Sequence, residues 1–152
     1  MAIEIEHKYL VIDTAFKQYT LQSKHIFQGY LSKDKERTVR IRVSDNDAFI
    51  TIKGKNHGDK RLEFEYSIPY DDAKHLLDLC IKPIIEKFRH IVEYNGNIWE
   101  IDEFKGALDG LILAEIEIPS SEYKYDIPPF IGKNVTNDSR YYNSNLVDKI
   151  PE

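Results

Sequence analysis

Charged residues at every second position are the sequence feature that most constrains the fold. The segment at residues 3–10 reads IEIEHKYL, in which Glu4, Glu6 and Lys8 alternate with other residues. In a β-strand, side chains two residues apart lie on the same face. The strand would therefore place two carboxylates and one ammonium group on one side and leave its other side for packing.

The same alternation recurs in six later segments. The charged pairs are Arg40/Arg42, Lys53/Lys55, Glu63/Glu65, Lys87/Arg89, Glu100/Asp102 and Glu115/Glu117. For any single pair, a polar face turned to solvent is the ordinary explanation. Most of these segments, however, carry charge of one sign, and like charges aligned along a strand are destabilising unless something of opposite sign binds them.

Composition describes a soluble globular chain and excludes several classes of protein. Its 152 residues are 41% hydrophobic and 31% charged, which suits one domain with one core. No apolar run approaches the roughly 18–20 residues of a membrane span. Acidic residues stand where a signal peptide would be apolar, and a single cysteine fits a reducing compartment, so we expect a cytoplasmic protein with no membrane partner. The net charge of −5 argues against a nucleic-acid partner.

Turn signals divide the chain into about eight antiparallel strands and two or three helices. We expect strands over residues 3–10, 24–31, 38–55 (a hairpin), 61–68, 84–94, 97–104 and 111–119. We expect helices over residues 13–20, 70–80 and 138–147. The predicted class is α+β, with a large sheet or a closed barrel.

Turn positions predict which charged side chains face one another. A turn at residues 95–96 would place Arg89 opposite Asp102, and a turn at residues 109–110 would place Asp102 opposite Glu117. These registers would bring basic and acidic strands onto one shared surface.

The first hairpin extends this surface, and the next connection leaves a question open. A turn at residues 45–46 would place Arg40 opposite Thr51. The connection over residues 55–63 places Glu63 and Glu65 on the same surface as Lys53 only if its loop has an odd number of residues. A two-residue turn at residues 58–59 would break that parity.

A polyanion bound together with metal ions would balance both signs of charge. Basic side chains hold phosphates, and carboxylates hold hard divalent cations that bridge to phosphate oxygens. The apolar faces must then be covered from outside. The sequence therefore predicts a closed eight-stranded antiparallel β-barrel, a tunnel with a polar charged interior and with helices packed outside.

Taken in order, these motifs resemble those of the CYTH superfamily, the triphosphate tunnel metalloenzymes, and specifically its short bacterial members. The resemblance rests on the N-terminal Glu-x-Glu-x-Lys and on the charged pairs that follow, and it covers residues 1–152 as a single domain. It implies a tunnel that binds a small-molecule triphosphate and hydrolyses or cyclises it with Mg²⁺ or Mn²⁺. It also makes a homodimer reasonable.

The resemblance also implies roles for individual residues. The metal-binding carboxylates would be Glu4, Glu6, Glu115 and Glu117, with Asp102 and Glu63 as further candidates. The phosphate-binding residues would be Arg40, Arg42, Lys53, Lys87 and Arg89, with Lys55 paired in the motif. Lys8 would lie near the scissile phosphoryl group, either to move a proton or only to neutralise charge. Tyr30 would lie near Lys8, as a packed tyrosine or as a catalytic group.

Several activities are compatible with this resemblance. Hydrolysis of inorganic tripolyphosphate is our first choice, because the small chain offers a complete phosphate site and no evident insertion for a nucleobase. The alternative is a class IV adenylate cyclase, followed by a thiamine or nucleoside triphosphatase. A non-catalytic polyphosphate-binding module is a different class of answer, and the acidic pairs argue against it because an anion binder has no need of them.

Overall fold

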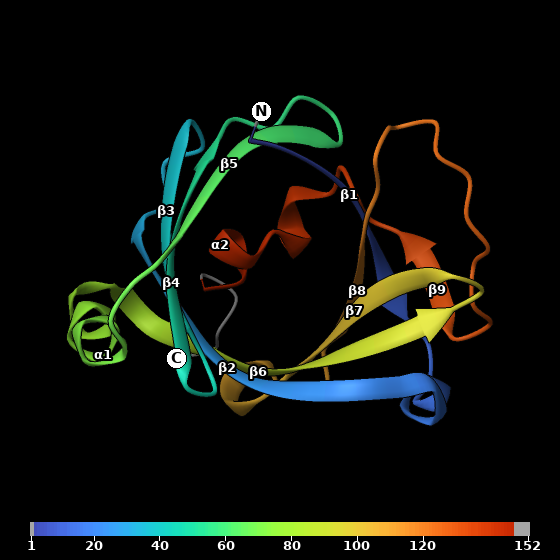
Figure 1. Ribbon diagram of the computed structural model, residues 1–152, viewed down its shortest axis with the longest axis horizontal. Coiled ribbons are helices and arrows are strands. Elements are labelled where there is room, and N and C mark those ends of the chain that lie inside the picture. The colour runs from blue at the N-terminus through green and yellow to red at the C-terminus, as the bar shows by residue number, and fades with distance from the viewer. Residues whose placement is uncertain (1, 148–152) are drawn as a thin grey trace.

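Eight antiparallel strands close into a barrel in the computed structural model, which describes residues 2–147 (Figure 1). The strands are β1 (Ile3–Val11), β2 (Thr20–Ser32), β3 (Arg37–Ser44), β4 (Asp47–Gly54), β5 (Lys60–Ser67), β6 (Ile81–Tyr94), β7 (Asn97–Phe104) and β8 (Ile112–Glu117). Their order is β5-β4-β3-β2-β6-β7-β8-β1, and pairing of β1 with β5 closes the ring. A short strand, β9 (Ile131–Asn134), adds to the far half of β1. The predicted closed eight-stranded antiparallel barrel is confirmed.

The helices are few and short. They are η1 (Ala15–Tyr19), α1 (Tyr70–Leu79), η2 (Gly106–Leu108), η3 (Ser139–Tyr141) and α2 (Asn143–Leu146), where η denotes a 3₁₀ helix. The helix expected over residues 13–20 is η1, and the one expected over 70–80 is α1, which packs outside the barrel (Figure 1). No helix within residues 2–147 is both long enough and apolar enough to cross a membrane.

The expected C-terminal helix takes a different form and place. Residues 138–147 form the two short pieces η3 and α2, and α2 lies inside the ring of strands (Figure 1). Its Leu146 is fully buried with Phe104 and Leu113 in a cluster that also contains Tyr30 and Ile85. On their strands, these residues share a face with charged residues, so one end of the barrel interior is apolar and α2 fills it.

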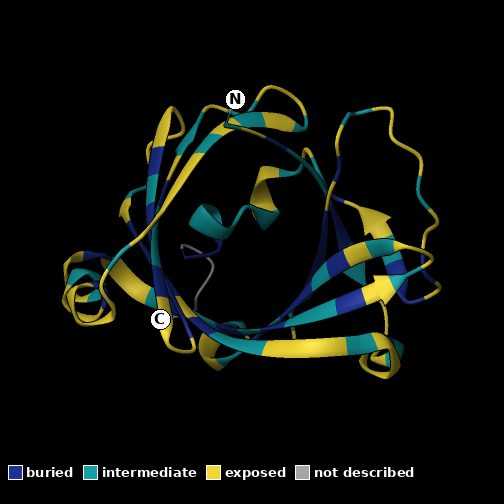
Figure 2. Cartoon of the chain, in the orientation of Figure 1, coloured by how far each residue is buried: buried dark blue, intermediate teal, exposed yellow. Residues whose placement is uncertain are grey.

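Apolar side chains on the outer face are covered by two different elements. Trp99, Ile101 and Ile116 are fully buried in a cluster to which η1 contributes Phe16 and the segment before β9 contributes Phe130. Helix α1 covers a second cluster on β3 and β4. Where both faces of a strand are covered, consecutive residues are buried, as at residues 113–116 of β8, whereas helix α1 and residues 21–23 of β2 are largely exposed (Figure 2).

Two predicted registers are confirmed and one is wrong. Arg40 faces Thr51 and Arg89 faces Asp102, as the turns at residues 45–46 and 95–96 imply. Asp102, however, faces Leu113 instead of Glu117. The chain turns through a longer loop that begins with η2, where Gly106 has a φ of 64°, and that also includes the predicted turn residues 109–110. Because the shift from 117 to 113 is even, every side chain of β8 keeps its predicted face.

The connection between β4 and β5 keeps the parity that the sequence left open. A two-residue turn does form at its tip, where His57 pairs with Lys60. The next pair is Lys53 with Glu63, so the β4 side contains one extra residue. A turn of two residues alone would put the acidic side chains of β5 on the outer face. The extra residue shifts the pairing by one position and so brings them to the interior face.

Substitution of Gly29 by alanine should destabilise the barrel. A Cβ atom there would lie 2.6 Å from Ile84 Cδ1 and 2.8 Å from Cys80 Cβ, so the wall around β2 would have to shift. We expect Gly29→Ala to lower the free energy of unfolding by about 1–3 kcal/mol in urea titrations. Gly54→Ala is the matched control, since its nearest neighbour would be Leu62 Cβ at 3.4 Å. Equal unfolding midpoints for the two variants would contradict this packing argument.

Candidate active site

The barrel encloses a cavity of about 220 Å³ lined by polar and charged side chains. Its walls include most of the residues expected at the site, namely Glu4, Glu6, Lys8, Tyr30, Arg40, Arg42, Lys53, Glu63, Arg89, Glu115 and Glu117. Among the described lining residues, only Tyr30 and Tyr142 contribute an aromatic ring, and none has an aliphatic side chain. The interior is therefore suited to a highly charged ligand.

Arg40 on β3 lines the cavity and has one buried donor without a hydrogen-bond partner among the described residues. Its Nη2 donates to Thr51 Oγ1 (3.1 Å) and lies 3.5 Å from a carboxylate oxygen of Glu65. Its buried Nε, by contrast, is one of two buried side-chain nitrogens or oxygens in residues 2–147 that have no hydrogen-bond partner. A buried donor without a partner is costly, so this position favours an incoming oxygen.

Arg42 lies beside Arg40 on the same strand face and is crowded by positive charge. Burial, followed by repulsion from Arg40 and Arg89, lowers the pKa of Arg42 to about 9. A guanidinium in these surroundings is stabilised by an anion more than one in water would be.

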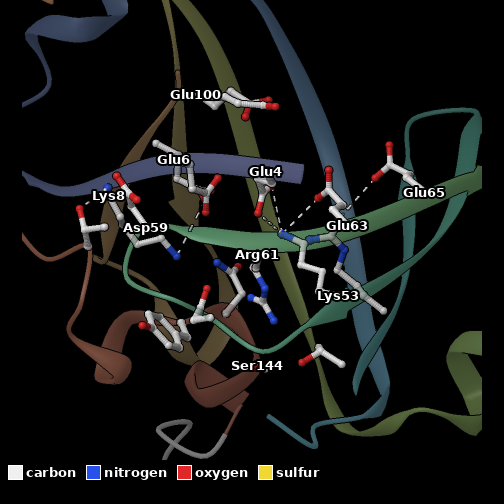
Figure 3. Close-up of a pocket in the computed structure, with 18 of the residues that line it drawn as sticks. Glu4, Glu6, Lys8, Lys53, Asp59, Arg61, Glu63, Glu65, Glu100 and Ser144 are labelled. Carbon is white, nitrogen blue, oxygen red and sulfur yellow. Dashed lines mark hydrogen bonds and ion pairs between the residues drawn. The ribbon is translucent and has the colours of Figure 1, made fainter. Parts of the chain in front are cut away.

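The acidic residues gather around β1. Lys53 Nζ donates to Glu4 Oε1 at 3.0 Å and lies 3.2 Å from Glu63 Oε2 (Figure 3). Glu6 on β1 faces Glu117 on β8 across the ladder. Burial, followed by the charges of Glu115 and Glu4, raises the pKa of Glu6 well above its usual value.

Crowding of this kind suits a divalent cation. Burial, and then the charges of Glu4 and Glu100, raise the pKa of Glu117 as well. Carboxylate oxygens are the ligands that hard divalent cations prefer, and a cation would remove the repulsion among them. Within the described part of the chain, no three acidic, histidine or cysteine side chains already converge at metal-binding distances, so binding would require these side chains to turn.

Lys8 lies between the acidic residues and the C-terminal segment (residues 139–147). Its Nζ donates to the backbone oxygen of Tyr141 at 3.1 Å and lies 3.9 Å from Glu115 Oε2. The Lys8 side chain is buried apart from its access to the cavity. Tyr30 packs in the apolar cluster at the end of the cavity and lines it from there.

Lys87 and Asp102 lie behind the cavity wall. Lys87 Nζ is 2.7 Å from Asp102 Oδ2, while Arg89 Nε donates to Asp102 Oδ1 at 2.8 Å. Burial opposes ionisation of Asp102, but Arg89 and Lys87 outweigh it and hold its pKa at about 2. Burial lowers the pKa of Lys87 to about 7 despite this carboxylate, with Arg89 and Arg42 contributing. Arg89 Nη2 also donates to Glu115 Oε1 at 3.1 Å and so connects this buried group to the cavity.

Lys55 lies outside the cavity, as do the buried Lys87 and Asp102, and several lining residues had no role assigned from the sequence. Lys55 follows the end of β4, is exposed and does not line the cavity. Glu65 and Glu100, which the sequence marked as members of charged pairs without a specific role, line the cavity. Arg61, which alternates with Glu63, was not singled out and lines it as well. Tyr142, Asn143 and Ser144 also line the cavity, and no pattern in the sequence marked them.

The fold and the cavity define an antiparallel barrel with a charged, anion-binding interior. The chain belongs to the CYTH family, because the family model described as the CYTH domain matches residues 2–152. Membership of this family implies a requirement for a divalent metal ion.

Two characterised relatives match nearly the whole chain. An inorganic triphosphatase of Acetivibrio thermocellus is 44% identical, covering 97% of this chain and 94% of the relative. An inorganic triphosphatase of Nitrosomonas europaea is 32% identical, covering 97% and 99%. The crystal structure of the inorganic triphosphatase NE1496 superposes with a TM-score of 0.73 at 30% identity, covering 100% and 99% of the two chains.

Stability should fall as the pH drops below 4, partly through Asp102. The folded-state pKa of Asp102, about 2, lies below its ordinary value of 3.8. Its ionised form therefore stabilises the protein above pH 4, and this contribution is lost as the pH falls toward 2. We expect Asp102→Asn to flatten the decline of the urea midpoint between pH 4 and pH 2.

The same variant should be less stable at neutral pH by about 3–5 kcal/mol, because Lys87 and Arg89 lose their buried counter-charge. Asp109→Asn, an exposed substitution of the same kind, serves as the control and should change neither quantity. An unchanged pH profile in Asp102→Asn would contradict the assignment of this carboxylate to the buried ion pairs.

Proposed function

We propose that this protein hydrolyses inorganic tripolyphosphate, with water attacking the terminal phosphorus atom. The observation that carries the proposal is the cavity lining, which combines several cations with several carboxylates and, in residues 2–147, includes no aliphatic side chain. Such a cavity provides charge for phosphates and little apolar surface for a nucleobase. The names of the two relatives support the same substrate.

The basic residues in the cavity are proposed to bind the phosphate oxygens. Arg40, with its unpartnered Nε, and Arg42 lie on β3, and Lys53 and Arg89 reach the cavity from neighbouring walls. Phosphoryl transfer requires little covalent chemistry from the protein, so positioning and charge stabilisation by these groups supply most of the rate. Lys87 supports them from behind the wall instead of contacting the substrate.

The acidic residues are proposed to bind Mg²⁺ or Mn²⁺. Glu4, Glu6, Glu115 and Glu117 are the main candidates, and Glu63 is a further one beside Lys53. A cation bound there would polarise phosphoryl oxygens and neutralise charge on the leaving group. Asp102 is assigned to the orientation of Arg89, because its two oxygens already accept from Arg89 and Lys87.

Lys8 is proposed to neutralise charge on the terminal phosphoryl group. Its ammonium is fixed by the Tyr141 carbonyl oxygen and lies next to Glu115, among the metal candidates. Tyr30 is proposed to be a packed residue that shapes the end of the cavity, since it belongs to the apolar cluster around Phe104.

The decisive test is phosphate release from tripolyphosphate and from ATP, with Mg²⁺, Mn²⁺ or EDTA, and with cyclic AMP measured in the same reactions. We expect metal-dependent release that is faster from tripolyphosphate than from ATP, and no cyclic product. Cyclic AMP with pyrophosphate would instead establish an adenylate cyclase. Faster release from thiamine triphosphate or a nucleoside triphosphate would reassign the substrate, and binding without turnover would indicate a polyphosphate-binding module.

Glu117→Gln should lower turnover of tripolyphosphate at least a hundredfold without loss of stability. The substitution removes a proposed metal ligand and also relieves the repulsion that raises the Glu117 pKa. Steady-state kinetics and a thermal melt measure the two effects. Glu93→Gln, at an exposed position on β6, is the control. Unchanged turnover in Glu117→Gln would remove this residue from the metal site.

Arg40→Ala should raise KM for tripolyphosphate about tenfold or more, with a smaller change in kcat. The reason is the loss of a charge-assisted contact that is present in both the bound substrate and the transition state. A fall in kcat at constant KM would indicate a role confined to the transition state.

Three further proposals rest on the sequence and the resemblance alone. They are a homodimer, a cytoplasmic location and the lack of a nucleic-acid partner. Light scattering coupled to gel filtration would test the first, since a monomer at micromolar concentration would contradict it.

A further inference from the structure

Gln28 on β2 is a fully buried neutral side chain in the most highly charged part of the barrel. Its Oε1 accepts two hydrogen bonds from Arg42, from Nε at 3.0 Å and from Nη2 at 2.8 Å. Its Nε2 donates to Asn143 Oδ1 at 2.9 Å. The same Asn143 oxygen accepts from Lys87 Nζ at 3.0 Å. Gln28 therefore joins a cavity arginine to the C-terminal segment.

The orientation of both amide groups follows from the chemistry of their neighbours. Arginine and lysine side chains only donate hydrogen bonds. Lys87 therefore requires the oxygen of Asn143, and Arg42 requires the oxygen of Gln28. The remaining contact between the two amides is then a donor facing an acceptor, so each of the three contacts in the chain Arg42–Gln28–Asn143–Lys87 pairs a donor with an acceptor.

Arg42 and Arg89 are fixed in the same way but by different charges. The guanidinium of Arg89 is bound by the carboxylate of Asp102 and also contacts Glu100 and Glu115. Arg42 forms no salt bridge within residues 2–147 and is fixed by the neutral oxygen of Gln28. The positive charge of Arg89 is thus compensated by the protein, whereas that of Arg42 remains available to a ligand.

We propose that Gln28 is a positioning residue that orients Arg42 toward the phosphates while leaving its charge uncompensated. Binding of Nε and Nη2 by Gln28 fixes the plane of the guanidinium, and Nη1 has no hydrogen-bond acceptor within residues 2–147. Arg42 lines the cavity. A carboxylate at position 28 would fix the Arg42 guanidinium in the same plane but would neutralise its positive charge. An apolar side chain would leave the positive charge of Arg42 uncompensated, but it would no longer fix the orientation of the guanidinium. The proposal rests on the proposed function in that the ligand is taken to be tripolyphosphate.

The test measures binding separately from turnover. Isothermal titration calorimetry with tripolyphosphate in EDTA gives Kd for the wild type, Gln28→Met and Gln28→Glu. We expect both variants to raise Kd at least tenfold, Gln28→Met by releasing Arg42 and Gln28→Glu by neutralising it. Gln22→Met and Gln22→Glu, at an exposed position of the same strand, are the matched controls and should leave Kd unchanged. Circular dichroism establishes that each variant is folded.

A double-mutant comparison separates positioning from a general structural role. On an Arg42→Ala background, Gln28→Met should change Kd less than twofold, because the residue through which Gln28 acts is absent. The same fold-change on both backgrounds, or a lowered melting temperature with unchanged Kd, would overturn the proposal.

The outcomes also separate this proposal from the proposed function. Wild-type binding without phosphate release would refute hydrolysis and leave the role of Gln28 intact. Hydrolysis and binding that are both insensitive to Gln28 would refute only the positioning role. A wild type that does not bind tripolyphosphate would overturn both.

Discussion

Compensation of buried charge is the constraint on which the rest of this structure depends. An isolated charge inside a protein costs several kcal/mol, so a barrel with ionised groups inside must pair them or reserve them for a ligand. Asp102 shows the first solution, since it lies between Lys87 and Arg89 behind the wall. Arg42 shows the second, because it forms no salt bridge within residues 2–147 and is bound by the neutral oxygen of Gln28. The cavity is the region in which pairing within the protein is incomplete.

The architecture was predictable because its main signal is local. Alternation with a period of two fixes the face of every side chain in a strand, whatever the strand pairs with. The predicted partner residues were less secure, as Asp102 shows by facing Leu113 rather than Glu117. The connection from β7 to β8 includes both η2 and residues 109–110, and the sequence alone did not mark how long this loop is.

The site was predicted best where function and alternation coincide. Period and charge placed Glu4 and Arg42 on the interior face of the predicted barrel, and the resemblance supplied their roles. Both residues line the cavity. Lys55 follows the same pattern but lies past the end of β4, because strand length is set by the neighbouring strand and not by charge. Gln28 and Asn143 gave no signal, since a neutral amide is informative only when its neighbours in space are known.

The ring closes at a junction that is also part of the site. Pairing between β1 and β5 spans three residue pairs, fewer than any other junction in the barrel, and Glu4 is in the middle pair. Short ladders open at lower free energy than long ones. Opening of this seam would separate Glu4 from Lys53 while the remaining strands stay paired. The longer ladders carry Arg40, Arg42 and Arg89, whereas the shortest one carries Glu4.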